Sequence, residues 1–324
     1  MKIMRFIGIV FALFSAGSPS DTSAQDSGKK YKVYMVSNSH LDTQWRWDVK
    51  ATIDDYLYNT AVQNLALLEK YPHYVFNFEG AVKYEWIKEY YPHLFERIRK
   101  FVADGRWNIS GASFEANDPN MPSSESFIRN ILLAQEFYKK EFGIKSKDMF
   151  LPDCFGFSQV MPTLGHHCGL IGFSTQKLSW RTEPLVGDSK TPFPIGLWEG
   201  VDGARIMVAL EPGRYSWNEF PEGDLSANEE LAESARKSPF GIAYRYYGNK
   251  LANGAGDHGG SALPRSIQLL EEGITNGKGP VQLVSATSSQ LYEDYMPYGN
   301  HPELPVFVGE MPLDVHAPGC YTSQ

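Results

Sequence analysis

The hydrophobic positions of this chain change repeatedly between two patterns, and the change predicts short strands followed by helices. Residues 31–37 are rich in β-branched and aromatic side chains and predict a first strand. Apolar residues then recur at helical spacing from Leu57 to Leu68, after Thr52-x-x-Asp55, which resembles a capping box. Further strands are expected at 74–78, 107–111, 149–151, 172–175, 205–210 and 281–285. Further helices are expected at 81–103 with a break at Pro92, and at 127–142, 227–237, 265–272 and 288–295.

Strands that alternate with helices imply parallel βαβ units, and therefore an α/β fold with either a doubly wound sheet or a barrel. In both architectures the chemistry lies beyond the carboxyl ends of the strands. Candidate residues are therefore sought immediately after predicted strands. This rule selects His40 and Asp42, Asp153, and the glycine-rich loop 254–260.

The first residues have the order of a secretory signal peptide. Lys2 and Arg5 precede an apolar run at 6–16, and small residues follow at 22–24. This run is too short to cross a bilayer, which needs about 20 apolar residues in a helix. The sequence predicts a signal peptide at 1–24, a mature domain at 25–324, and an exported protein that is periplasmic or secreted.

Charge and cysteine content remove several classes of function. The chain has 30 basic and 38 acidic residues and a net charge of −8, so a nucleic-acid partner is not expected. Cys154, Cys168 and Cys320 form no CxxC pair, which argues against a thiolate zinc site or a thioredoxin-type centre. The remaining classes are an acidic enzyme or a binding protein.

The triplet His40-Leu41-Asp42 is the first candidate for chemistry. Residues i and i+2 of an extended chain face the same way, so an imidazole and a carboxylate can converge on one ion. A mixture of nitrogen and oxygen ligands suits zinc better than calcium. A surface histidine beside a solvated aspartate is the competing interpretation. Trp45 is a candidate for stacking on a sugar, or it simply covers the rim of the fold.

Two further carboxylates are candidates. Asp153 stands among Pro, Cys and Phe residues, where it must be paired, protonated or bound to a metal, unless it caps a helix. Asp257 lies beside His258 in the glycine-rich loop, which is either a mobile acid/base loop or a plain solvent loop. Two carboxylates and a metal would fit glycoside hydrolysis, or metal-assisted hydrolysis of an amide or ester.

Taken together, several segments resemble the N-terminal catalytic domain of the family 38 glycoside hydrolases, the α-mannosidases, over residues 31–324. The segments are HLDTQW (40–45), GRW (105–107), DPNMPSSES (118–126), LPDCFGF (151–157), QKLSW (176–180) and WEGVDG (198–203). Their order and spacing make the resemblance specific.

The resemblance implies a seven-stranded β/α barrel of the glycoside hydrolase and deacetylase type. It also implies a retaining, zinc-dependent α-mannosidase that hydrolyses terminal α-mannosyl residues of mannose-containing glycans. In this family pattern Zn²⁺ is bound by His40, Asp42 and Asp153. Asp153 is also the nucleophile, and Asp257 is the matching acid/base. The expected substrate-binding residues are Trp45, Asp118 and Trp180.

The closing segment 309–324 resembles an interior part of the family pattern. It therefore predicts that the chain lacks the family's C-terminal helical and β domains, and with them the fourth zinc ligand, a histidine. Two alternatives stay open: a metal-dependent polysaccharide deacetylase, and an inactive fragment that binds mannose without cleaving it.

Overall fold

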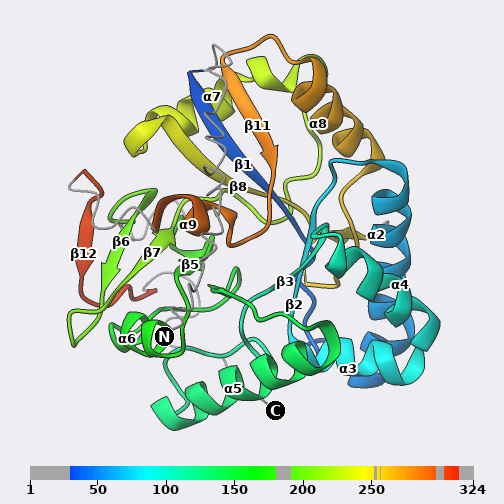
Figure 1. The fold of residues 1–324 in the computed structure, drawn as a ribbon, viewed down its shortest axis with the longest axis vertical. Helices are drawn as coiled ribbons and strands as arrows, with labels where there is room; N and C mark the ends of the chain where they lie inside the picture. The colour runs from blue at the N-terminus through cyan, green and yellow to red at the C-terminus, as the bar shows by residue number, and fades with distance from the viewer. Residues whose placement is uncertain (1–29, 180–190, 252–253, 256, 297–302, 314–324) are drawn as a thin grey trace, which may run out of the picture.

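In the computed structural model, peripheral helices surround two groups of mostly parallel strands (Figure 1). The structure describes residues 30–179, 191–251, 254–255, 257–296 and 303–313. The predicted signal peptide at 1–24 lies outside these residues. None of the helices within the described ranges is both long and apolar enough to cross a membrane.

The first sheet is built around β1 (Tyr31–Asn38), which is buried along nearly its whole length. The strand β8 (Ile242–Gly248) pairs with β1 in parallel over residues 32–38. Along the other edge of β1, β11 (Val281–Ser285) pairs with its beginning and β2 (Phe76–Glu79) with its end. The strand β3 (Trp107–Ser110) continues the sheet beside β2. All of these pairings are parallel, so the carboxyl ends of the strands lie at one edge.

The second sheet has the order β12-β6-β7-β5-β4. Its strands are β4 (Asp148–Phe150), β5 (Gly172–Ser174), β6 (Ile195–Glu199), β7 (Arg205–Ala209) and β12 (Val306–Val308). The pair β6–β7 is antiparallel and the other pairs are parallel. The predicted α/β class with parallel strands is confirmed.

The predicted closed seven-stranded barrel is not confirmed, because no ladder in the described residues joins the two sheets. Single backbone hydrogen bonds cross the gaps, from Ala112 N to Asp148 O at 2.9 Å and from Tyr246 N to Pro212 O at 2.8 Å. The strands β4 and β5 are three residues long, which leaves few backbone groups for pairing. The two sheets still share one buried cluster, in which Tyr34 of β1 packs with residues of β4, β7 and β8.

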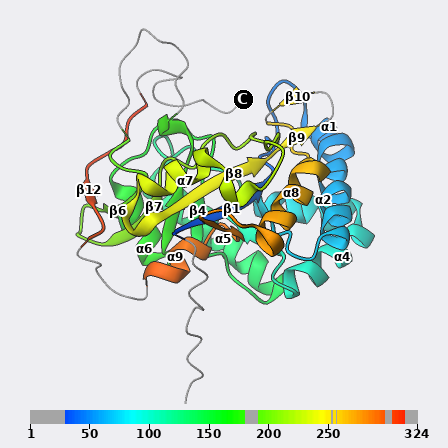
Figure 2. The ribbon, with the colours of Figure 1, turned by 90° about the horizontal axis from the view of Figure 1, so that it is seen from above.

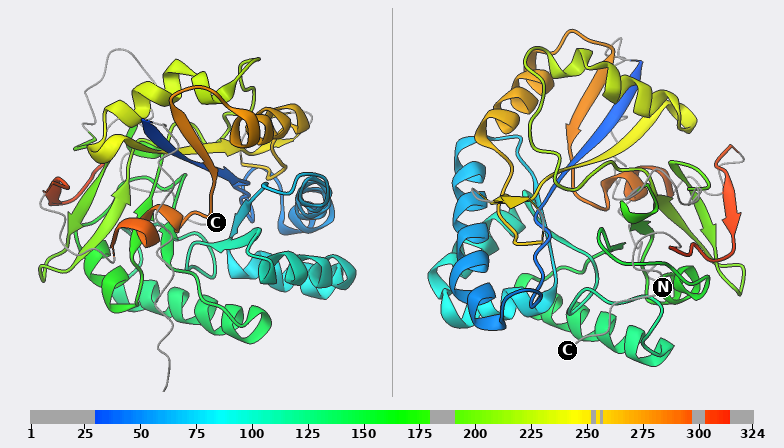
Figure 3. Two further views of the ribbon diagram at one scale, coloured as in Figure 1. Left: turned by 45° about the horizontal axis from the view of Figure 1, so that its top comes forward. Right: turned by 180° about the vertical axis from the view of Figure 1, so that it is seen from behind.

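The helices lie outside the strands, and Figure 3 shows this layer from two further directions. The α-helices are α1 (Val49–Ala51), α2 (Tyr58–Lys70), α3 (Ala81–Tyr90), α4 (Pro92–Ala103), α5 (Ser124–Phe142), α6 (Val160–His167), α7 (Glu229–Arg236), α8 (Pro264–Asn276) and α9 (Gln290–Tyr295). A π-helical segment, Thr52–Leu57, joins α1 to α2. The 3₁₀ turns are Lys177–Ser179, Leu225–Ala227 and Pro239–Gly241, and a short hairpin is formed by β9 (Lys250–Leu251) and β10 (Gly254–Ala255).

Two helix boundaries show which local signals decided the fold. The break predicted at Pro92 is confirmed, because α3 ends at Tyr90 and Pro92 begins α4. The capping box predicted at Thr52 is wrong. Asp48 caps the helix instead, with its carboxylate accepting a hydrogen bond from Ala51 N at 2.8 Å. Helical structure therefore starts three residues before Thr52.

Candidate functional site

The candidate site lies at the carboxyl ends of β1 and β4, as expected for an α/β fold. His40 follows β1 by two residues and is 4% exposed, and Asp42 lies two residues further along the chain. Asp153 follows β4 by three residues. The helix-capping interpretation of Asp153 is wrong, because α6 begins only after Gln159.

Backbone pairing brings the glycine-rich loop to His40 and Asp42. Asp42 N donates to Asp257 O at 2.9 Å, and Gly259 N donates to His40 O at 2.9 Å. Figure 2 shows the neighbouring hairpin β9–β10 beside α1, the first helix after these residues. Gly259 has φ +75°, and a Cβ there would stand 2.3 Å from Thr60 Oγ1, so only glycine fits. The loop is thus fixed by its backbone at Asp257.

The side chains gather around the Nε2 atom of His40. Asp42 Oδ1 lies 3.2 Å from Nε2 and Asp153 Oδ2 lies 4.0 Å from it. Ligand atoms of His40, Asp42 and Asp257 all lie within 4.8 Å of one another. The structure therefore brings together the three predicted metal ligands and the predicted acid/base, and the group whose ligand atoms lie within 4.8 Å of one another contains Asp257 in place of Asp153.

This donor set fits a divalent cation. Zinc–ligand bonds of about 2.0–2.1 Å in a tetrahedron put ligand atoms about 3.3 Å apart, close to the separation between His40 and Asp42. Burial alone would lower the pKa of His40, but the carboxylates of Asp42, Glu79 and Asp153 raise it well above its ordinary value. The surroundings of Nε2 therefore favour a positive charge.

Asp153 is paired with a buried lysine that the sequence analysis did not assign a role. Lys177 Nζ lies 2.6 Å from Asp153 Oδ1, and the Lys177 side chain is 1% exposed. The ammonium also stands over the ring of Phe155, 4.3 Å from its centroid. Burial raises the pKa of Asp153, and the positive charges of His40 and Lys177 oppose that rise. Lys177 therefore favours the ionised carboxylate that a nucleophile requires.

Asp257 receives a hydrogen bond from Tyr215, whose hydroxyl donates to Oδ1 at 2.6 Å. Tyr215 is 6% exposed, its ring lies 5.6 Å from that of His40, and burial raises the pKa of its hydroxyl. Tyr215 thus stays protonated and fixes one oxygen of Asp257. His258, the next residue, stacks on Trp47 with ring centroids 4.3 Å apart.

The predicted substrate-binding residues differ in their exposure and in their contacts. Trp45 is 43% exposed, and its ring meets that of Trp47 edge-on. Asp118 Oδ1 accepts hydrogen bonds from Asn120 N at 2.8 Å and Met121 N at 3.1 Å, so it stabilises its own turn. Trp180 lies outside the described residues. Trp45 is thus partly exposed as expected, but the guanidinium of Arg46 stands over its ring, 4.3 Å from the centroid.

Buried charges behind His40 form a second group that the sequence analysis missed. Glu79, at the end of β2, lies 3.0 Å from Lys83 Nζ and 3.6 Å from His40 Nδ1. Burial alone would raise the pKa of Glu79, but Lys83 and His40 lower it to about 2. The signal available in the sequence was a charged residue at each end of Glu79-Gly80-Ala81-Val82-Lys83, inside a segment of otherwise apolar pattern.

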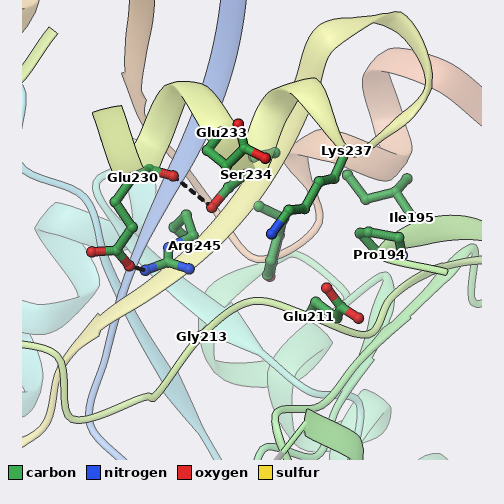
Figure 4. A pocket seen from close by; sticks show the side chains of 11 residues that line it. Pro194, Ile195, Glu211, Gly213, Glu230, Glu233, Ser234, Lys237 and Arg245 are labelled. Carbon is green, nitrogen blue, oxygen red and sulfur yellow. Dashed lines mark hydrogen bonds and ion pairs between the residues drawn. The ribbon is translucent and has the colours of Figure 1, made fainter. Parts of the chain in front are cut away.

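Two hollows lie outside this cluster. A cavity of about 300 Å³ lies between α7, β8 and the segment after β7, where Glu230 pairs with Arg245, and where Lys237 and Glu211 also line the wall (Figure 4). A larger hollow of about 590 Å³ lies beside the Asp153 loop, bordered by Asn120 and Phe157 among others. No predicted metal ligand or catalytic residue lines either hollow in the part of the chain that the structure describes.

Comparison with known proteins shows one family over most of the chain. The model of the "Glycosyl hydrolases family 38 N-terminal domain" matches residues 30–310. Alpha-mannosidase G of Dictyostelium discoideum is 32% identical over 302 residues, which cover 93% of this chain and 26% of that protein. Human alpha-mannosidase 2C1 is 31% identical over 296 residues, which cover 91% of this chain and 26% of that protein.

Solved structures show the same fold. The crystal structure of an alpha-mannosidase from Enterococcus faecalis superposes with a TM-score of 0.68 at 23% identity, and covers 87% of this chain and 31% of that one. A 4-alpha-glucanotransferase from Thermococcus litoralis superposes with a TM-score of 0.54 at 15% identity, covering 88% and 40% of the two chains. The chain spans about a quarter of the length of the curated relatives it matches.

Proposed function

The chain belongs to glycosyl hydrolase family 38, and from this premise we propose that it carries the catalytic site of a retaining, zinc-dependent α-mannosidase. The substrate is a terminal α-mannosyl residue of a mannose-containing glycan. One observation carries the proposal. His40, Asp42, Asp153 and Asp257 come from three separate parts of the chain and converge around one imidazole nitrogen.

In this proposal His40, Asp42 and Asp153 hold Zn²⁺, and Asp257 stands beside them. Zinc held by these residues would supply positive charge that favours the ionised form of Asp153, and it would offer a Lewis acid for hydroxyl groups of the mannose ring. Lys177 acts on Asp153 in the same sense from the other side, through the 2.6 Å ion pair. Asp153 is therefore kept as a carboxylate although it is largely buried.

The two carboxyl groups then divide the chemistry. Asp153 attacks the anomeric carbon and forms a glycosyl ester, while Asp257 gives its proton to the departing oxygen. Asp257 next takes a proton from water, which attacks the anomeric carbon, breaks its bond to the Asp153 oxygen and releases mannose with the same anomeric configuration as the substrate. Tyr215 holds Asp257 in place for both steps. Trp45 is proposed to stack against the sugar.

The proposal also includes export, since residues 1–24 have the order of a signal peptide. Expression in a bacterial host should give a periplasmic or secreted product. Its first residue, determined by N-terminal sequencing, is expected to be Gln25. A product that keeps Met1 and stays in the cytoplasm would contradict this part of the proposal.

The decisive experiment measures zinc content and hydrolysis of an aryl α-mannoside by the same purified chain. Asp153→Asn and Asp257→Asn should each lower turnover by a factor of at least about 10³ while the protein stays folded. Asp202→Asn makes the same chemical change at an exposed carboxylate paired with His167, and should leave turnover unchanged. Wild-type turnover in the Asp153 variant would refute the proposed nucleophile.

Product analysis separates the alternatives. Proton NMR of the first product should show α-mannose, whereas an inverting enzyme would give β-mannose. Release of acetate from an acetylated glycan without release of mannose would instead identify a deacetylase. Mannose binding by calorimetry with no hydrolysis and little zinc would identify a binding fragment.

A further inference from the structure

A row of alternating charges lies behind His40, on the opposite side of the imidazole from the candidate metal site. Glu79 Oε1 is 3.6 Å from His40 Nδ1 and 3.0 Å from Lys83 Nζ. Lys83 Nζ is in turn 3.6 Å from Glu115 Oε1. The row therefore runs from the imidazole to a carboxylate, to an ammonium and to a second carboxylate.

The first three members of this row are shielded from water. The side chains of His40, Glu79 and Lys83 are 5%, 4% and 0% exposed. A buried charge is tolerated only when an opposite charge or a hydrogen bond compensates its lost hydration. Glu79 has its two charged neighbours on different elements: His40 follows β1, and Lys83 lies in the first turn of α3. The carboxylate thus links these two elements at the base of the site.

The two nitrogens of His40 face different groups. Nε2 faces Asp42 and Asp153, whereas Nδ1 is buried, makes no hydrogen bond to the described residues, and has Glu79 Oε1 as its charged neighbour at 3.6 Å. A histidine binds a metal through a nitrogen that carries no proton, so its remaining proton must stand on the other nitrogen. A carboxylate facing that other nitrogen fixes both the tautomer and the ring orientation.

We infer that Glu79 is a positioning residue for His40, because its carboxylate holds the ring proton on Nδ1 and leaves Nε2 free to bind the metal. The inference rests on the zinc site of the proposed function, and it adds a residue that touches neither metal nor substrate. Lys83 holds the Glu79 carboxylate in turn, through the ion pair at 3.0 Å.

Gly80 supports the same arrangement. Its φ of +90° lies in the region that favours glycine, and a Cβ at this position would stand 2.9 Å from Lys83 Nζ. The chain therefore turns sharply after Glu79 and leaves space for the ammonium. In this way the junction between β2 and α3 is shaped around the Glu79–Lys83 pair.

Three variants separate positioning from a purely structural role. Glu79→Gln keeps the size of the side chain and removes its charge, and should raise the Kd for zinc about 10–100-fold. Lys83→Met leaves Glu79 buried without its ammonium partner, and should lower the melting temperature. The double variant Glu79→Gln/Lys83→Met removes both charges, and should recover much of the melting temperature while zinc binding stays weak. If Glu79 had a purely structural role, the melting temperature and the zinc affinity of the double variant would recover together.

The measurement is titration of the full chain with zinc chloride in competition with a chromophoric chelator, alongside thermal melting. Asp148→Asn is the matched control, because it removes another buried carboxylate that does not face His40. Its Kd for zinc should equal that of the wild type. Nitrogen NMR of the zinc-loaded wild type should show the His40 proton on Nδ1, with the signal assigned from its loss in His40→Ala.

The outcomes are distinct. Three results would each overturn the inference. The first is wild-type zinc affinity in Glu79→Gln, the second is recovery of zinc affinity in the double variant, and the third is a His40 proton on Nε2. Because the NMR measurement uses the wild type, it tests the inference even if a variant fails to fold. The expected affinity pattern in a chain that hydrolyses no mannoside would support the inference and refute the proposed function. A wild-type chain that binds no zinc would overturn both the inference and the zinc site.

Discussion

Asp148 is a buried carboxyl group whose ionisation the fold opposes, so its replacement gives a stability test of defined sign. It is 1% exposed and begins β4, five residues before Asp153. Burial raises the pKa of Asp148 from 3.8 to about 6, although hydrogen bonds from Ser288, Gly111 and Ser146 oppose the rise. At neutral pH the folded protein therefore carries a carboxylate in an unfavourable place.

The direction in which stability changes with pH follows from the pKa of Asp148 in the folded and unfolded states. Because the pKa of Asp148 is higher in the folded state, the stabilisation from its protonated form is complete below pH 3.8 and is lost as the pH rises through about 6. The difference between these two pKa values corresponds to about 3 kcal/mol, at about 1.36 kcal/mol per unit. Asp148→Asn is neutral at every pH and similar in size. We expect it to be more stable than the wild type by up to about 3 kcal/mol near pH 8, and about equal near pH 4.

Urea unfolding at both pH values measures this difference, with tryptophan fluorescence and circular dichroism as parallel probes. With a slope on the order of 3 kcal/mol per molar urea, the midpoint of Asp148→Asn should lie about 1 M higher near pH 8. Asp202→Asn is the control of opposite sign, since hydrogen bonds from Thr163 and His167 lower the pKa of this exposed carboxyl. The reasoning is refuted if the midpoint difference for Asp148→Asn is the same at both pH values, or if the variant is less stable near pH 8.

Three further predictions concern the site. The ammonium of Lys177 lies 2.6 Å from Asp153 and lowers the pKa of that carboxyl, so Lys177→Met should raise this pKa. Turnover of an aryl mannoside should therefore fall, and the acidic limb of its pH–rate profile should move to higher pH; an unchanged limb would contradict this. Gly80→Ala should destabilise the fold by about 1–3 kcal/mol through its positive φ and its contact with Lys83. Gly105 also has a positive φ but open space around it, so Gly105→Ala should lower the melting temperature less than Gly80→Ala. Equal losses of melting temperature in the two variants would exclude a contribution from the contact with Lys83. Removal of zinc by a chelator should abolish hydrolysis and added zinc should restore it, whereas full activity after verified removal would refute the zinc requirement.

The sequence predicted best those elements whose signals are local. The break at Pro92 and the C-terminal end of α5 at Gly143 depend on one or two residues each and are confirmed. The helix α5 begins three residues before the predicted start at Phe127, because Ser123 caps it. The strand β11 has the predicted bounds. By contrast β8 (Ile242–Gly248) was missed, although it pairs with β1 along seven residues. A parallel strand buried on both faces shows no alternation of polar and apolar positions, so its pattern did not stand out.

The candidate site was predicted as residue types but not as an arrangement. His40, Asp42 and Asp153 stand where strands end, so the general rule for α/β folds was enough to select them. No comparable rule selected their partners Lys177, Tyr215 and Glu79 from the sequence. Each of these is defined by a neighbour far away in the sequence, and only the folded chain shows which groups face each other.

The way in which Asp257 reaches the site explains why spacing alone could not place it. Its loop is joined to the segment after β1 by two backbone hydrogen bonds, which are independent of the side chains involved. Asp257 itself has φ +60°, a conformation that Asp adopts more readily than most residues. Backbone pairing thus fixes the carboxyl group beside Asp42, and the hydroxyl of Tyr215 then selects the orientation of its oxygens. In the proposed mechanism, a carboxyl group held in this way, by backbone hydrogen bonds on one side and the Tyr215 hydroxyl on the other, gives and takes a proton without moving its main chain. Both halves of a retaining mechanism need this property, since the same group must first give a proton and then take one.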